Sequence, residues 1–484
     1  MEKRTKGILR EVIRLRNTLQ PVNRLPPEII ALCAAFVPRA NLKPIVSLTH
    51  VCRYWRGAIT SSSSNWTLIG NKWARLAPLC LERAGAAPLT ITISAPGVWE
   101  RGLGDFFRAL FPHTTRISHL SLAMCSTIER ETDKHPGLFA SMPGLTSLEH
   151  SRSGKPAEWF PSNETPIPPL FWNVSKLTSL RLTQTPLYST LFNIASLVEL
   201  RFDGREIHFQ KFLGFLESNH SLEIVVLELE FVRGSVLTSP ERMVSLPRLR
   251  HLALTCKHPI NARGLLSCLS FPRGVNIEVR ECKGESCGNL TSFLPRPPTP
   301  IQDLLAPITT MKSWPKPEGF HLSGSGGSFS FCFGETPRKY DQEFDLFATD
   351  AVRQVHISLD IWLGYRGLGS RNSWPFKRLP ALEVLVISGY RRDLGPLAAL
   401  TKDPALCPSL KTIALLDYMG SPEAFKDLES MLTERENSTA ARLHRIVIAN
   451  KTRDMPNLIQ SIGRLRKLAA HVDIIVGDDL PDLL

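Results

Sequence analysis

The sequence predicts a mixed α/β chain in which a short helical module precedes a solenoid of alternating strands and helices. Three observations predict this arrangement. Apolar residues recur at helical spacing within residues 24–66, a six-residue leucine-rich phrase recurs from residue 117 onward, and helical patterns lie between its copies. The chain has 484 residues and a hydrophobic fraction of 43%, which is enough to bury a sizeable core.

Residues 1–23 predict a basic helix. Ile8, Val12, Leu15 and Leu19 follow one another at steps of three and four, with lysines and arginines around them. Residues 1–95 hold fourteen lysines and arginines against four acids, so this part of the chain suits an acidic partner. The helix could lie on a membrane or bind nucleic acid. We expect it instead to pack against the module that follows or against the first repeats.

Residues 24–66 predict three short helices. Pro27 suits the first turn of a helix. Two apolar sets at helical spacing follow: Ile29, Ile30, Cys33 and Phe36, then Leu48, Val51 or Cys52, Trp55 and Ile59. Such a unit is too small to bury its core well by itself, so it should lean on the next segment or on a partner.

The same residues resemble an F-box. L-P-x-E-I-I begins at Leu25, L-x-x-V-C-R-x-W-R begins at Leu48, and Trp66 follows. The segment CLERAGAAPLTITIS is similar to the piece that joins F-box and leucine-rich array in a group of fungal F-box proteins. The resemblance implies docking on the acidic Skp-type adaptor of a cullin–RING ubiquitin ligase. The docking residues that it implies are Leu25, Pro26, Ile29, Ile30, Leu48, Val51, Cys52 and Trp55.

The recurring phrase reads L-x-x-L-x-L in its regular form. Its copies begin at Ile117, Leu145, Leu177, Leu197, Leu222, Leu249, Val352, Leu382, Leu410 and Leu443. The phrase predicts a short strand whose alternate residues point inward. Helical patterns fit between copies, as in GLGDFFRALF, FQKFLGFLESN and PEAFKDLESMLTEREN. Strand and helix in alternation, with variable repeat length, resemble an irregular leucine-rich-repeat array over residues 67–287 and 343–484.

Residues 288–342 interrupt the repeated phrase. Proline-rich stretches predict a loop or linker, and FHLSGSGGSFSFCF predicts a hairpin with alternating phenylalanines after a glycine-rich turn. SGSGGS is not a phosphate-binding loop, because no Lys-Ser/Thr follows it and a hairpin surrounds it.

In leucine-rich arrays the residues that flank the inner leucine of L-x-L face the concave surface, where partners commonly bind. Early repeats place charged residues there, among them Arg181 and Arg201, whereas late repeats place Val386, Leu416 and Val447. We therefore expect the target protein to bind on this surface, with the three late residues as an apolar anchor unless a loop or the tail covers them.

No residues are expected to do chemistry or to hold a cofactor or metal ion. His50 and Cys52 point to different sides of a helix, and no nucleotide, zinc-protease or hydrolase motif appears. The ten cysteines lack paired zinc spacing, so we expect reduced, mostly buried thiols. No signal peptide or apolar run of membrane length appears, which predicts an intracellular protein in the cytoplasm or nucleus.

The resemblance implies a substrate-recognition subunit of an SCF-type ubiquitin ligase, which holds a target protein and is not itself an enzyme. Its expected partners are the Skp-type adaptor, the cullin–RING ligase core and a protein substrate. The alternative is a non-catalytic leucine-rich scaffold or a nucleic-acid-associated protein whose F-box-like module is only structural. Strong salt dependence of nucleic-acid binding would favour that alternative.

Overall fold

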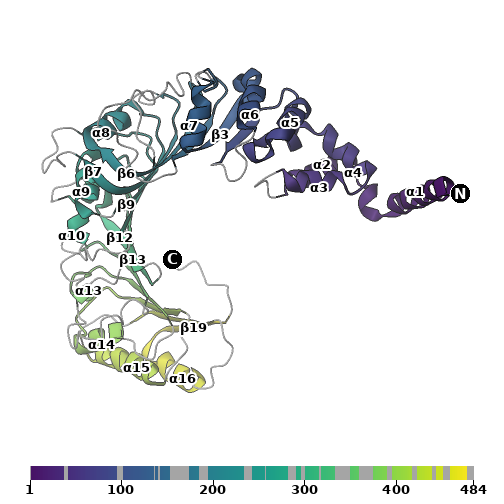
Figure 1. The fold of residues 1–484 in the computed structure, drawn as a ribbon. Coiled ribbons are helices and arrows are strands. Elements are labelled where there is room, and N and C mark those ends of the chain that lie inside the picture. Colours follow the sequence, from purple (N-terminus) through teal and green to yellow (C-terminus); the bar gives the residue numbers. More distant parts are fainter. Residues whose placement is uncertain are drawn as a thin grey trace. The chain divides into compact units, whose positions relative to one another are not determined.

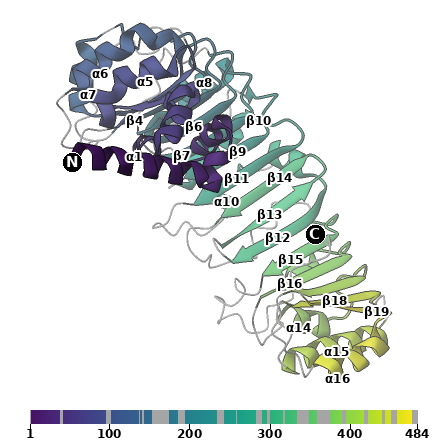
Figure 2. The ribbon, with the colours of Figure 1, turned by 90° about the vertical axis from the view of Figure 1, so that its right-hand side faces the viewer.

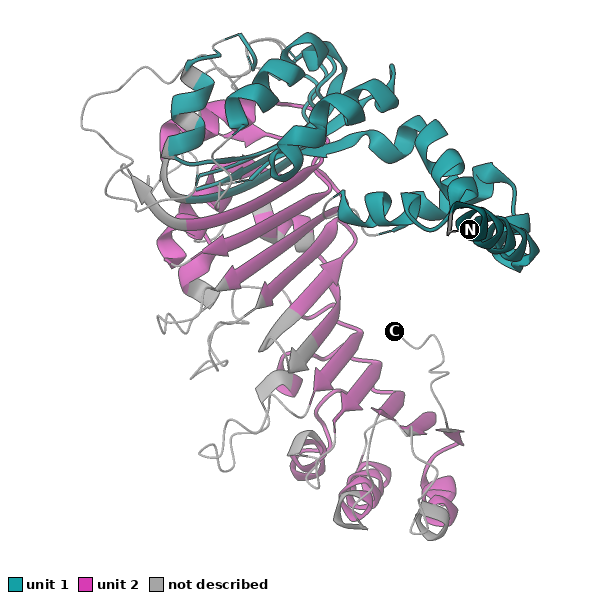
Figure 3. Ribbon diagram, turned by 45° about the vertical axis from the view of Figure 1, so that its right-hand side comes forward, with its two compact units in different colours: residues 1–204 teal, residues 205–484 magenta. Residues whose placement is uncertain are grey.

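A computed structural model gives the fold of the chain (Figure 1). It describes residues 2–37, 42–94, 102–135, 137–139, 142–152, 174–184, 194–233, 243–256, 258–281, 290–295, 300–315, 318–332, 349–358, 374–389, 395–416, 422–438, 443–450 and 458–476. The chain divides into two compact units, Met1–Gly204 and Arg205–Leu484 (Figure 3).

The first unit begins with helices. They are α1 Glu2–Leu19, η1 Pro21–Arg24, α2 Pro27–Ala35, α3 Lys43–Thr49, α4 Arg53–Ser61 and η2 Ser63–Trp66. Both α2 and α3 pack against α4. The buried apolar side chains of these helices include Ile30, Ala34, Ile45, Ala58 and Ile59. Residues 24–66 are termed the helical module below.

Trp66 connects the helical module to α5, which follows it in the chain. Its side chain is buried, and its Nε1 donates a hydrogen bond to the carbonyl oxygen of Ile59 at 3.0 Å. The guanidinium of Arg83, on α5 (Ala77–Ala84), lies 4.4 Å from the centre of the Trp66 ring. This cation–π contact and the buried ring give the small module the support it lacks alone.

Helix α1 does not pack as the sequence led us to expect. Ile8, Val12, Leu15 and Leu19 are all more than half exposed. Within the described residues, α1 packs against η1, where Asn23 Nδ2 donates to the carbonyl oxygen of Asn17 at 2.6 Å. Because η1 turns the chain at Pro21, α1 is held at its end rather than along its apolar side.

The rest of the first unit alternates strands and helices. Its elements are β1 Leu68–Gly70, η3 Asn71–Leu76, α5, β2 Leu89–Ile93, α6 Leu103–Leu110, η4 Phe111–Arg116, β3 Ile117–Met124, α7 Ser126–Asp133, β4 Ser147–Arg152, β5 Ser179–Thr183 and the first part of β6 Glu199–His208, which continues into the second unit. Each strand from β1 to β6 pairs in parallel with the next one in the chain. Helices α5, α6 and α7 lie along one face of these strands (Figures 1 and 2).

Strand residues alternate between the two faces, as the period of two requires. In β3 the buried residues Leu120, Leu122 and Met124 alternate with Ser121 and Ala123. Register carries this pattern across the strands, because Leu120 is opposite Leu148 and Leu148 is opposite Leu180. One face therefore builds the core against the helices, and the other face is left for polar side chains.

The second unit repeats this plan. Its elements are α8 Phe209–Ser218, β7 Ile224–Arg233, β8 Val244–Ser245, β9 His251–Cys256, α9 Pro259–Ser267, β10 Leu269–Ser270, β11 Val275–Glu281, α10 Leu290–Phe293, α11 Pro300–Leu305, β12 Ile308–Pro315, β13 Glu318–Gly324, β14 Gly327–Cys332, β15 Gln354–Ser358, α13 Trp374–Lys377, β16 Val384–Ser388, α14 Gly395–Lys402, β17 Thr412–Leu416, α15 Pro422–Asn437, β18 Arg445–Asn450, α16 Leu458–Leu468 and β19 His471–Val476. Strands β7, β9 and β11 are parallel, and so are β15 to β19.

The described residues within 288–342 include three strands that belong to the sheet, whereas the proline-rich stretches that predicted a loop or linker lie partly outside the described residues. The predicted hairpin is present as β13 and β14, and β12 pairs antiparallel with β13. β14 pairs in parallel with β11, and β12 pairs in parallel with β15, so the three strands fill the gap in the parallel series. Buried Leu322, Phe329 and Phe331 supply the same core face as the leucines of the neighbouring strands. Phe333, also expected to alternate there, lies outside the described residues.

The mixed α/β class is confirmed. Each of the ten copies of the repeated phrase contains a strand, and the three helical patterns correspond to α6, α8 and α15. The leucines of the phrase succeed as a predictor because they form the face that every strand must bury.

Candidate protein-binding surfaces

Apolar side chains are exposed along one side of α2. Ile29, Leu32 and Phe36 occur at steps of three and four, and Phe36, which caps the helix, is 80% exposed. Leu25, which precedes α2, and Val51, between α3 and α4, are exposed as well. Exposed apolar groups gathered on one module are typical of protein-interaction sites. These five residues are termed the module surface.

Ile30 was expected to dock on a partner but belongs to the core of the helical module. Its side chain is 1% exposed, on the side of α2 that also carries Ala31 and Ala34. α2 packs against α4, so this side of the helix is already covered. The assignment of Ile30 to a docking surface is therefore corrected. Neighbouring Ile29 points about 100° away around the helix and stays exposed.

The other expected docking residues divide into two groups. Leu25, Pro26, Ile29 and Val51 are exposed, whereas Leu48, Cys52 and Trp55 are half-buried. The stretch from His50 to Ile59 is not one helix: α3 ends at Thr49, and Cys52 is extended before α4 begins. This break places Val51 in a turn, which explains its exposure.

Trp55 and Tyr54 hold α4 against the chain that precedes α2. Trp55 Nε1 donates to Asn23 Oδ1 at 2.7 Å, and the Tyr54 hydroxyl donates to the carbonyl oxygen of Leu25 at 2.6 Å. Trp55 is half-buried, and a buried indole N–H usually finds such a partner. Trp55 is therefore first a structural residue of the module, whereas the bond from Tyr54 helps to fix Leu25 in place.

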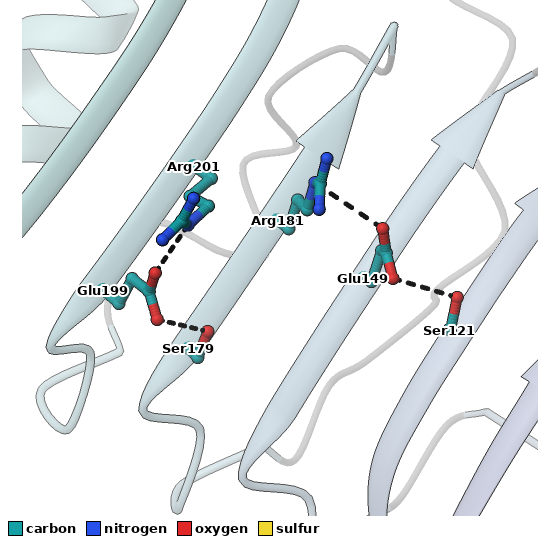
Figure 4. A network of polar contacts seen from close by, with 6 residues as sticks. All are labelled: Ser121, Glu149, Ser179, Arg181, Glu199 and Arg201. Atoms are coloured by element: carbon teal, nitrogen blue, oxygen red, sulfur yellow. Dashed lines mark hydrogen bonds and ion pairs between the residues drawn. The ribbon is translucent and has the colours of Figure 1, made fainter. Parts of the chain in front are cut away.

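Polar side chains line the open face of the first unit's strands (Figure 4). Ser121 of β3 donates to Glu149 Oε2 of β4 at 3.2 Å, and Arg181 Nε of β5 lies 3.6 Å from Glu149 Oε1. One row away, Ser179 of β5 donates to Glu199 Oε2 of β6 at 3.1 Å. Arg201 Nε donates to Glu199 Oε1 at 2.6 Å. These six residues are termed the arginine–glutamate ladder.

The ladder presents two ordered guanidinium groups side by side. Arg181 and Arg201 are in register on neighbouring strands, and both side chains are more than half exposed. The hydrogen bond from Arg201 holds the pKa of Glu199 below its ordinary value, and burial opposes this effect. The contacts described for both arginines use Nε, which leaves the terminal nitrogens to bind carboxylate or carbonyl oxygens of a partner.

The late strands of the second unit do not expose an apolar anchor. Val386, Leu416 and Val447 are 0%, 6% and 0% exposed and form one cluster with Ala414 and Ala449. Val386, Ala414 and Val447 are in register, as the repeated phrase predicts. Because Leu385 and Ile387 are also buried, β16 is covered on both faces. The expectation that these three residues await a partner is therefore corrected for this structure.

A third part of the strand face carries histidines. Lys312 of β12 is in register with His321 of β13 and with His356 of β15. His321 Nδ1 is 2.7 Å from Ser330 Oγ, and His356 Nε2 is 2.9 Å from Ser388 Oγ. Burial, and then the charge of Lys312, lowers the pKa of both imidazoles, that of His356 to about 4. Both rings are therefore neutral near pH 7, and they offer hydrogen bonds rather than charge.

Reactive groups are not gathered in the described part of the chain. Among its residues, no set of three or more histidine, cysteine or acidic side chains is placed to hold a metal ion. Burial raises the pKa of Cys80 to about 11 and that of Cys407 to about 12, which makes both thiols poor nucleophiles. None of the described helices is long and apolar enough to cross a membrane.

Comparison with known proteins does not assign the chain to a family. No protein-family model matches the chain, and no curated protein matches it. The inference of function therefore rests on the module surface and on the arginine–glutamate ladder.

Sequence reasoning missed the acidic members of the ladder. It found Arg181 and Arg201 by their place in the phrase but not Glu149 and Glu199. Glu199 and Arg201 are two residues apart on one strand, so they share a face. Glu-x-Arg within a predicted strand is the signal that could have identified this pair.

Proposed function

We propose that this chain is the substrate-recognition subunit of an SCF-type cullin–RING ubiquitin ligase, in which the helical module docks on a Skp-type adaptor. The observation that carries the proposal is the module surface. Leu25, Ile29 and Val51, three positions that the F-box resemblance assigns to the adaptor, are exposed apolar side chains on a module whose own core is closed by Ile59 and Trp66. Leu32 and Phe36 extend that surface.

Charge supports an acidic partner for this end of the chain. Residues 1–95 hold fourteen basic and four acidic residues. Such an excess speeds encounter with an acidic surface, while apolar contacts at the module surface supply most of the affinity. The alternative of a scaffold that binds nucleic acid uses the charge but leaves the module surface unexplained.

The arginine–glutamate ladder is the proposed contact for the target protein. Its two guanidinium groups are pre-ordered by Glu149 and Glu199, which lowers the entropic cost of binding. They suit a target segment that presents a carboxylate or carbonyl oxygens as hydrogen-bond acceptors. The chain would then act by holding that target near the ubiquitin-loaded enzyme, and would raise its effective concentration without doing chemistry.

Co-purification with the adaptor tests the proposal. The wild-type chain should capture a purified Skp-type adaptor, and Ile29→Asp should weaken capture at least about tenfold because it places a charge at the centre of an apolar contact. Leu25→Ala/Pro26→Ala should act in the same direction. Leu79→Asp is the matched control, since Leu79 on α5 is 38% exposed and Ile29 is 40% exposed.

Two outcomes would count against the proposal. Failure of the wild type to capture the adaptor would sink it. Equal loss with Ile29→Asp and Leu79→Asp would show that the effect is not local to the helical module. If the wild type instead bound DNA or RNA with a steep dependence on salt, the scaffold alternative would be favoured.

A further inference from the structure

Helix α1 carries an apolar side that nothing in the described structure covers. Ile8, Val12, Leu15 and Leu19 are 50% exposed or more, and so are Leu9 and Ile13 beside them. Single exposed leucines are normal on a protein surface, but six on one 18-residue helix are not. The side chains share one broad side, because steps of four, three and four separate the first four.

The opposite side of α1 is a basic stripe. Lys3, Lys6, Arg10 and Arg14 follow at steps of three, four and four, and all four side chains are exposed. Glu11 lies 3.8 Å from Arg14 in an exposed ion pair that contributes little. Arg16 falls within the apolar side, and its long stem can lie along apolar surface while the guanidinium reaches water.

Asn23 connects this helix to the helical module. Its Nδ2 donates to the carbonyl oxygen of Asn17 in the last turn of α1, and its Oδ1 accepts from Trp55 Nε1. The helix is therefore attached at its C-terminal end, and its apolar side stays exposed along its length.

We propose that α1 lies flat on an anionic lipid surface. A lipid surface engages both sides of the helix at once, since acyl chains take the apolar side and anionic headgroups attract the basic stripe. A protein groove or a second copy of the chain would cover the apolar side and leave the stripe in water. A nucleic acid would cover the basic stripe and leave the apolar side in water. The inference does not depend on the ubiquitin-ligase proposal.

Flotation with lipid vesicles tests this inference on the full chain. Vesicles of phosphatidylcholine with added phosphatidylserine should bind the wild type, and vesicles of phosphatidylcholine alone should bind it much less. Leu15→Asp should weaken binding by about fiftyfold or more, because it removes an apolar side chain that the acyl chains would cover and adds a charge of the wrong sign. Raised salt should also weaken binding.

Thr18→Asp is the matched control. Thr18 is exposed on the polar side of α1, and the substitution changes the net charge by the same amount as Leu15→Asp. It should weaken binding by about fivefold or less, through charge alone. The same samples are assayed for capture of the Skp-type adaptor, which Leu15→Asp should leave unchanged.

Several outcomes would overturn the inference. Absence of binding to phosphatidylserine vesicles, or equal binding to both kinds of vesicle, contradicts an anionic lipid surface. Equal effects of Leu15→Asp and Thr18→Asp contradict insertion of the apolar side. If Leu15→Asp left vesicles unaffected but abolished adaptor capture or dimer formation, the apolar side would belong to that protein contact.

Discussion

The strand faces of β3–β6 and of β16–β18 are built from the same repeated phrase and differ in what they present. In the first set, Arg181 and Arg201 occupy the position next to the inner leucine and stay more than half exposed. In the second set, Val386 and Val447 occupy that position and are fully buried. A charged row remains open to water, whereas an apolar row of the same geometry is covered.

This difference shows which features of the surface the repeated phrase determines and which it leaves open. The leucines settle which face of each strand packs on the helices, and that face is alike in both sets. The residues between the leucines decide whether the other face can stay hydrated. Guanidinium and carboxylate groups keep their hydration, but a row of valine, alanine and leucine is stable only when it is removed from water.

The largest expected effect comes from placing a charge in the covered row. Val447→Asp should lower the free energy of unfolding of the second unit by about 3 to 5 kcal/mol, since an unpaired carboxylate would be buried. Arg201→Gln, at the corresponding position of the open row, removes an exposed ion pair and should cost less than about 1 kcal/mol. Chemical denaturation checks both, and tolerance of Val447→Asp would mean that the late row is open in solution.

The next effect concerns a buried arginine behind the covered row. Arg435 of α15 is 1% exposed and donates to the carbonyl oxygens of Pro404, Leu406 and Cys407, just before β17. Arg435→Met should destabilise the second unit by about 2 to 4 kcal/mol, because two buried carbonyls and one half-buried carbonyl lose their donor. The control Arg464→Met removes an exposed partner of Glu429 and should cost less than about 1 kcal/mol. Similar costs for the two would refute the role of Arg435.

A smaller effect should follow pH at the histidine pair of the second unit. The folded-state pKa of His356 is lowered to about 4 from an ordinary value of 6.5. As the pH falls, His356 is therefore protonated in the unfolded chain at a higher pH than in the folded chain. The free energy of unfolding should fall as the pH drops from about 6.5 toward 4. Lys312→Gln should raise the pKa of His356 without restoring it fully, because burial is the larger cause. Titration of the imidazole by NMR measures this, and an unchanged pKa would exclude the influence of Lys312.

The smallest effect is expected within the open row itself. The lowered pKa of Glu199 means that its bond from Arg201 stabilises the folded state at neutral pH and that this contribution is lost as pH falls through the lowered pKa. Glu199→Gln should therefore cost about 1 kcal/mol or less at neutral pH and nothing in acid. Urea denaturation at the two pH values checks the sign; an equal cost at both would argue against an ion-pair contribution.

Sequence reasoning predicted the strands well because the spacing of the leucines follows the two-residue period with which a strand buries one face in the core. It placed Arg181 and Arg201 on one open face for the same reason. It failed where burial depends on residues far away in the chain. The sequence around Val386 is the same whether its face of the strand is open or covered. Likewise, the residues next to Ile30 do not show that α4 packs over Ile30 while Ile29 stays exposed.

The helices show the same limit. The spacing of Ile8 and Val12 predicted α1, but no pattern within α1 states whether another element packs on it. Residues 288–342 were predicted to form a loop or linker at their proline-rich stretches and a hairpin at FHLSGSGGSFSFCF. Phe329 and Phe331, at the period of a strand, were the better guide to their place in the sheet.

Hydrogen exchange of the chain with and without a purified Skp-type adaptor tests the central claim most directly. The account predicts slower exchange in residues 25–36 and 48–55 when the adaptor binds, and no change in β16–β18, whose apolar row is already covered. Ile29→Asp should abolish that protection while Leu79→Asp keeps it. Protection confined to other segments, or no protection at any adaptor concentration, would contradict docking through the module surface.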